Sequence, residues 1–134
     1  MVDQDEICKV GDFGLLRELP KDVEIYVAKT KVAFPIRWMA PESLMRKEFS
    51  PASDVWSFGV VMWEMFNPRL KPYKGMNNIE VAVNVNQGKR LDIPEPYPPT
   101  VARIMKACWQ HSPSKRPSFL LIASLLTSVY YGAE

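Results

Sequence analysis

The chain has 134 residues, of which 47% are hydrophobic and 24% are charged, and its formal net charge is +2. These values suit one small globular domain with its own core. Lys and Arg residues nowhere run together for five or more positions, so the sequence gives little support to binding of nucleic acid or a charged membrane surface. Cys8 and Cys108 are too few for a disulfide framework and lack metal-ligand spacing, which predicts reduced thiols in a cytosolic domain.

Membrane insertion is not expected. Residues 1–6 are acidic and polar, without the basic start and apolar centre of a signal peptide. The longest apolar stretch, 55–66, is interrupted by Ser57 and Glu64 and is too short to cross a bilayer. We therefore expect a cytoplasmic chain.

The first half of the chain predicts little regular structure. Ile7–Val10 alternates apolar and mixed residues, as a short strand would. Residues 15–37 show no sustained period and contain Pro20 and Pro35, which predicts a long loop. Pro41 suits the first position of a short helix.

The stretch 55–66 predicts a central helix. Capping residues precede it at 50–54, and Asn67-Pro68 stops it. It is apolar on nearly every side, which is typical of a helix in the middle of a domain.

Residues 76–88 are ambiguous by pattern. Ile79, Val81, Val83 and Val85 alternate and are β-branched, which favours a strand. A cap at Asn77 or Asn78 and a stop at Gly88 favour a helix.

Two amphipathic helices are predicted near the end of the chain. Val101, Ile104, Met105, Cys108 and Trp109 follow the helical period after Pro98-Pro99. The pattern repeats after Pro117 with Phe119, Ile122, Leu125, Leu126 and Val129.

Several short motifs occur in a fixed order along the chain. Asp12-Phe13-Gly14 and Ala40-Pro41-Glu42 are the triplets that bracket the activation segment of protein kinases. Between and after them come Pro35-Ile36-Arg37-Trp38, Asp54-Val55-Trp56-Ser57-Phe58-Gly59, Cys108-Trp109 and Lys115-Arg116-Pro117. Together they resemble the C-terminal lobe of a tyrosine kinase, and the stretch 70–78 is most similar to receptor tyrosine kinases of the insulin-receptor group.

This resemblance implies a mainly α fold over residues 1–134: a partial kinase C-terminal lobe with a short N-terminal strand, an activation loop and about five helices. It also favours a helix over residues 77–86. The parent reaction it implies is ATP-dependent phosphorylation of protein tyrosine, in a cytoplasmic domain that could be the intracellular part of a membrane receptor.

The resemblance also implies roles for individual residues. Asp12 would bind Mg²⁺, and Tyr26 would be the phosphorylation site of the activation loop. Pro35, Ile36 and Trp38 would form the substrate platform. Three structural residues complete the set: Glu42 and Arg116 as a buried ion pair, and Asp54 reduced to capping its helix.

The parts that carry out phosphoryl transfer are not found in this sequence. A kinase needs a glycine-rich loop, a phosphate-binding lysine, and a catalytic-loop Asp and Asn. We therefore name no catalytic residue, and we expect the chain alone to be inactive and to bind neither ATP nor Mg²⁺. The alternative is a non-catalytic module that binds substrates or partners, among them an intact kinase or a chaperone.

Overall fold

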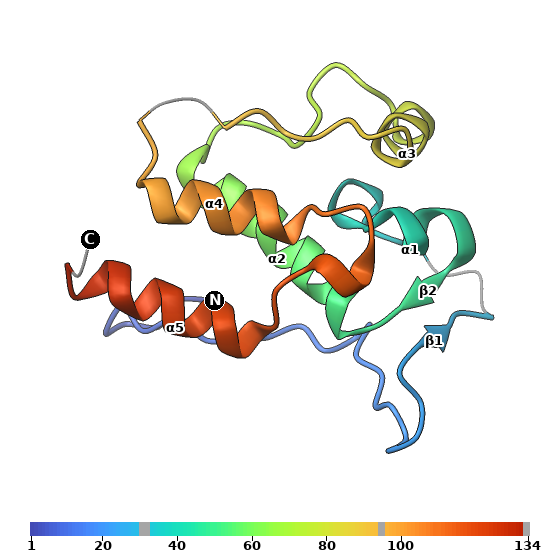
Figure 1. The fold of residues 1–134 in the computed structure, drawn as a ribbon, viewed down its shortest axis with the longest axis horizontal. Coiled ribbons are helices and arrows are strands. Elements are labelled where there is room, and N and C mark those ends of the chain that lie inside the picture. The colour runs from blue at the N-terminus through green and yellow to red at the C-terminus, as the bar shows by residue number, and fades with distance from the viewer. Residues whose placement is uncertain (30–32, 94–95, 133–134) are drawn as a thin grey trace.

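The computed structural model describes residues 1–29, 33–93 and 96–132, and these form a mainly helical fold with one small sheet (Figure 1). The five α-helices bear out the mainly α expectation. In chain order, the elements are β1 (Tyr26–Val27), η1 (Ile36–Trp38), α1 (Pro41–Arg46), β2 (Glu48–Phe49), α2 (Pro51–Phe66), α3 (Asn78–Asn86), α4 (Pro99–Cys108), η2 (Pro113–Lys115) and α5 (Phe119–Tyr130).

Helix α2 runs through the middle of the helical group, as Figure 1 shows, and packs against α4. Gly59 permits this close approach, because a Cβ there would lie 2.7 Å from the Trp109 Nε1 and 2.8 Å from the Cys108 Cβ. The core between the helices includes Trp56, Trp63, Val60, Ile104, Met105, Cys108, Trp109 and Ile122.

Helix α2 begins earlier than its apolar stretch predicts. Ser50 is the N-cap: its side chain accepts from the Ser53 N–H, and the Ser53 hydroxyl accepts in return from the Ser50 N–H. Pro51 takes the first helical position, which suits its fixed φ. The expectation that Asp54 caps this helix is therefore wrong, since Asp54 follows the cap within the first turn.

The ambiguous stretch near residue 80 is a helix. The Asn77 side chain accepts from the Glu80 N–H, and the Glu80 carboxylate accepts from the Asn77 N–H, so a capping box starts α3. Val81 and Val85, one turn apart, are buried, while Ile79 and Val83 are exposed. The alternation along the sequence thus arises from two rows on opposite faces of a helix.

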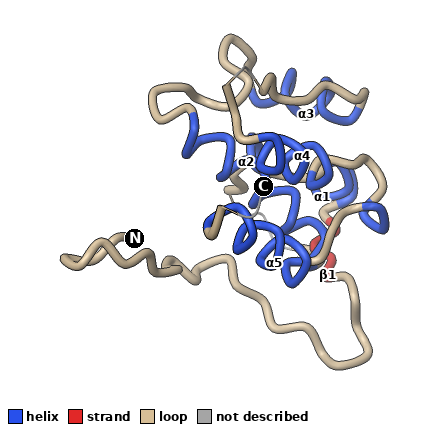
Figure 2. The backbone as a smooth tube through the Cα atoms, turned by 60° about the vertical axis from the view of Figure 1, so that its left-hand side comes forward, coloured by secondary structure: helices blue, strands red, loops and turns tan. Residues whose placement is uncertain are grey.

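The N-terminal segment, residues 1–25, contains no helix or named strand and forms a long loop, much of which extends away from the helices in Figure 2. The strand expected at Ile7–Val10 is reduced to a single antiparallel bridge between Cys8 and Val2. The named strands lie further along the chain, where Tyr26 pairs with Phe49 and Val27 with Glu48. Part of the predicted long loop is therefore fastened to the chain after α1.

Large apolar side chains remain exposed on several helices, including α2 and α5. On α2 they are Val61, Met65 (69% exposed) and Phe66, and on α5 they include Leu120 (84% exposed) and Leu121. Helix α5 contains no charged residue, and among its described residues only Ile122 is buried. None of the described helices is long and apolar enough to cross a membrane.

We expect the isolated chain to self-associate or to melt without cooperativity. Each 100 Å² of apolar surface left in water forgoes roughly 2.5 kcal/mol of stabilisation, against a total of about 5–15 kcal/mol for a typical domain. Light scattering should show oligomers, and a dye that binds exposed apolar surface should fluoresce strongly. A Met65→Lys/Leu120→Lys variant should reduce both signals. A monomer with a sharp two-state melt would contradict this expectation.

The two cysteines should differ in reactivity, because one is exposed and the other lies in the core. Burial raises the pKa of the Cys108 thiol to about 11, so little thiolate forms there near neutral pH. Iodoacetamide at pH 8 should therefore alkylate Cys8 and leave Cys108 unmodified until denaturant is added, as peptide mass spectrometry would detect. Equal labelling of both thiols without denaturant would contradict the packing of α4 against α2.

Candidate functional site

One cavity of about 550 Å³ brings together residues from distant parts of the chain. Asp12, Tyr26 and Pro35 line it from the segment between the two kinase-like triplets, and Asp54 and Ser57 line it from the first turns of α2. Apolar side chains, among them Met39 and the ring of Phe49, form much of the remaining wall. Four residues with different expected roles, Asp12, Tyr26, Pro35 and Asp54, therefore face one space.

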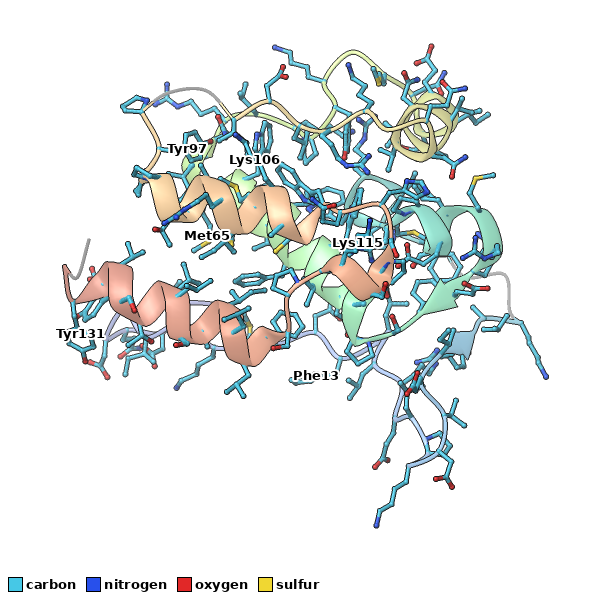
Figure 3. The ribbon with its side chains drawn as sticks, in the orientation of Figure 1. Phe13, Met65, Tyr97, Lys106, Lys115 and Tyr131 are labelled. Atoms are coloured by element: carbon cyan, nitrogen blue, oxygen red, sulfur yellow. The ribbon has the colours of Figure 1, made fainter. Side chains whose placement is uncertain are left out.

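Asp12 is exposed and has a φ of 60°, in the left-handed region. Asp is among the few residues that adopt this conformation at modest cost. The next side chain, Phe13, is 61% exposed and also lines the cavity (labelled in Figure 3). The Asp12 carboxylate has no ion-pair partner among the described residues.

Tyr26 is half-buried on β1. Its ring lies 6.4 Å from the ring of Phe49, centroid to centroid, on the paired strand. Three of the cations between residues 12 and 42 could pair with a phosphorylated Tyr26: Arg17, Lys29 and Lys31. Arg17 lines the same cavity but donates to the Gly14 and Leu16 carbonyls, and Lys29 is exposed. Lys31 lies outside the described residues.

Asp54 is exposed as a residue, but neighbouring protein removes water from part of its carboxylate. This partial burial raises the pKa of Asp54 above its usual value. No hydrogen bond or ion pair to this carboxylate is found within the part of the chain that the structure describes. Asp54 is thus a carboxylate beside a cavity with unused capacity to accept hydrogen bonds.

Of the residues expected to form the substrate platform, Trp38 is held by α2. The Trp38 indole N–H donates to the Glu64 Oε2 at 2.8 Å, and the Ser57 hydroxyl donates to the Trp38 carbonyl at 2.7 Å. Trp38 and Ile36 are half-buried against the core, whereas Pro35 is exposed and lines the cavity. Trp38 is therefore at least in part a packing residue.

Glu42 and Arg116 form a buried, two-pronged ion pair, as the sequence predicts. Arg116 Nη1 lies 2.6 Å from Glu42 Oε1, and Nη2 lies 2.9 Å from Oε2. The guanidinium also donates to the carbonyls of Ala52, Gln110 and His111. The pair joins α1 to the turn between α4 and α5, so it fixes the end of the 12–42 segment against the helical core.

Two arginines, one of them Arg116, lie against the indole ring of Trp56. The Arg116 guanidinium lies 5.1 Å from the centroid of the Trp56 ring, and the Arg90 guanidinium lies 4.6 Å from it, both within the range of a cation–π interaction. Arg90 also donates to the Trp109 and Val85 carbonyls. Burial lowers the pKa of Arg90, and the carbonyls and the ring face compensate for the water that its charge has lost.

The structural role of Arg37 could not be predicted from the sequence. Its side chain is buried between the platform residues and donates to backbone carbonyls of the loop before α3. The only signal in the sequence is a charge between two apolar residues, Ile36 and Trp38, and that pattern equally suits a solvated loop.

The residues in the cavity do not make a complete site for Mg²⁺ or a nucleotide. Mg²⁺ held by one or two carboxylates relies on waters and substrate phosphates for its other ligands. No group of three or more His, Cys, Asp or Glu is clustered for a metal within residues 1–29, 33–93 and 96–132. Among the residues that the structure describes, no lysine lines the cavity. Asp12 would supply one carboxylate ligand, and waters and a nucleotide would have to complete the site.

Comparisons with known proteins agree with the motifs. The family described as protein tyrosine and serine/threonine kinase matches residues 1–126. The chain is 43% identical to tyrosine-protein kinase SYK of Gallus gallus over 92% of its length, 43% identical to ephrin type-A receptor 6 of Rattus norvegicus over 94%, and 44% identical to the insulin receptor of Xenopus laevis over 94%. Because the three identities are nearly equal, they do not show which of these tyrosine kinases the chain resembles most. The chain spans only 20%, 12% and 9% of the three relatives, respectively.

Proposed function

Because the chain belongs to the protein tyrosine and serine/threonine kinase family, we propose that it forms the C-terminal part of a tyrosine kinase catalytic domain. The parent reaction is transfer of the γ-phosphoryl group of ATP to a protein tyrosine. The tyrosine kinases among its relatives, two of them receptors, support this assignment. The domain acts on the cytoplasmic side, alone or as part of a receptor.

The observation that carries the proposal is the convergence of Asp12, Tyr26 and Pro35 on one cavity. In this assignment Asp12 supplies one ligand of Mg²⁺, Tyr26 is phosphorylated by an intact kinase, and the platform supports the substrate chain. The hydrogen bonds from Trp38 to Glu64 and from Ser57 to Trp38 hold the platform at a fixed place on α2. Phosphoryl transfer depends mainly on such positioning.

A chimaera tests this assignment without requiring the isolated chain to be active. Residues 1–126 would replace the aligned segment in the kinase domain of chicken SYK, and phosphorylation of a poly-Glu/Tyr substrate would be measured. We expect activity, and we expect Asp12→Ala to reduce it by at least about 10²-fold. Asp5→Ala, at another exposed position, is the control. A folded chimaera no more active than its Asp12→Ala variant would contradict the proposal.

A second candidate is a non-catalytic module that binds a substrate or partner protein. It is favoured by the cavity itself, which presents the Asp12 and Asp54 carboxylates on mainly apolar walls. Such a site suits a segment with hydrogen-bond donors and apolar side chains. A monodisperse, cooperatively folded chain that binds a tyrosine-containing protein without ATP would favour this candidate.

A further inference from the structure

Arg37 is a buried cation without a carboxylate partner. It is 8% exposed, and no acidic side chain within the described ranges forms an ion pair with it. Its Nη1 donates to the Pro72 carbonyl at 2.8 Å and to the Tyr73 carbonyl at 3.0 Å, and its Nη2 donates to the Met76 carbonyl at 2.5 Å. Three carbonyls of one loop therefore converge on one guanidinium.

Within the loop, the Tyr73 carbonyl accepts from the Met76 N–H at 3.2 Å, and among the described residues Arg37 is the donor found for the Pro72 and Met76 carbonyls. Tyr73 has a φ of 53° and Gly75 a φ of 88°, so the backbone turns back on itself and directs carbonyl oxygens inward. Tyr73 is buried, and a left-handed backbone is costly for an aromatic residue unless its surroundings hold it. The planar fork of an arginine can reach several acceptors at once, which the single ammonium of a lysine cannot do in the same geometry.

The loop leads directly into α3. Met76, whose carbonyl accepts from Arg37, precedes Asn77, the N-cap of α3. On the other side, Arg37 belongs to η1 between Ile36 and Trp38. One side chain thus links the substrate platform to the first turn of a helix more than 30 residues further along the chain, and η1 also packs directly against α3.

We propose that Arg37 is a positioning residue that couples the substrate platform to α3 through the loop 72–76. A change in the conformation of the loop then alters the platform, and a change in the conformation of the platform alters the cap of α3. The coupling rests only on these contacts. Its use in substrate recognition rests on the proposed kinase function.

Hydrogen exchange, resolved by mass spectrometry after digestion, tests the coupling in the purified chain. The amides that report on it are those of Trp38 and Met39 in the platform and those of Met76 and Val81 at the loop and α3. Arg37→Gln should speed exchange at both places by about tenfold, the effect expected when hydrogen bonds to an ionised group are lost. Arg37→Lys should give an intermediate effect, and the exposed Arg103→Gln on α4 should give none.

The reciprocal variant is Gly75→Ala. No atom lies within 4 Å of a Cβ at that position, so the substitution acts on the backbone conformation alone. It should speed exchange at Trp38 and Met39 in the wild-type background and have no further effect there in Arg37→Gln. This variant keeps the test decisive if Arg37→Gln fails to fold.

Three results would overturn the coupling: faster exchange confined to one of the two places, equal acceleration in α4, or no protection at either place in the wild-type chain. Binding of poly-Glu/Tyr provides a separate measurement. If exchange is coupled but Arg37→Gln binds this polymer as the wild type does, the coupling stands and the substrate role of the platform is rejected.

Discussion

Purified residues 1–134 should transfer no phosphate from ATP to tyrosine. The sequence supplies Asp12 and the platform, but it contains no glycine-rich loop, no motif for the phosphate-binding lysine, and no catalytic-loop Asp or Asn. Loss of one group that stabilises the transition state typically costs about 10²–10³-fold in rate. Loss of several should leave nothing above the uncatalysed background.

The assay is incubation with ATP, Mg²⁺ and a poly-Glu/Tyr substrate, followed by detection of phosphotyrosine. Asp12→Ala is the matched control, because it removes the one metal ligand that the resemblance assigns. Wild-type signal above that control would mean that the chain assembles a working site from residues to which no role has been given.

Arg116→Ala should destabilise the fold more than any other single substitution to alanine on its surface or in its charged network. The Arg116 side chain is fully buried and Glu42 is 6% exposed, so truncation of Arg116 leaves a carboxylate buried without its cation. Such a loss costs roughly 3–5 kcal/mol. Removal of the guanidinium also leaves the Ala52 carbonyl without this donor and removes the cation from the face of Trp56.

Lys115→Ala is the control, since Lys115 is the exposed neighbour of Arg116 on η2 (Figure 3). Denaturant melts should show a large drop in midpoint for Arg116→Ala and almost none for Lys115→Ala. The double variant Glu42→Gln/Arg116→Met should lose less than the sum of its two single variants, because it leaves neither charge unpaired. Equal effects at Arg116 and Lys115 would contradict the burial of the pair.

The helices could be predicted from the sequence because their signals are local. Proline at a first position, caps at Asn77 and Ser118, and apolar side chains at helical spacing each lie within one or two turns. For α3 the alternating β-branched residues favour a strand, whereas the capping residues and the family resemblance favour a helix, and the structure confirms the helix. The ion pair between Glu42 and Arg116 could be predicted only by resemblance, since 74 positions separate the two residues.

Features that depend on the path of the loops could not be predicted. The pairing of Tyr26 with Phe49 involves two-residue strands, too short to leave a period in the sequence. The role of Arg37 depends on backbone carbonyls of a loop with two left-handed residues, and no side-chain pattern encodes where those carbonyls point. Asp54 is not the cap of α2, because Ser50 occupies that position and forms a reciprocal pair of hydrogen bonds with Ser53.

We propose that residues 1–134 are the C-terminal part of a kinase catalytic domain whose catalytic base and nucleotide-binding residues are encoded upstream. Sequencing of the native transcript through its 5′ end tests this most directly. We predict an open frame that continues upstream of Met1 and encodes a catalytic-loop Asp and Asn, a phosphate-binding lysine and a glycine-rich loop, in reverse order from Met1. An in-frame stop codon close upstream of Met1 in every transcript would contradict the claim and favour the non-catalytic binding module.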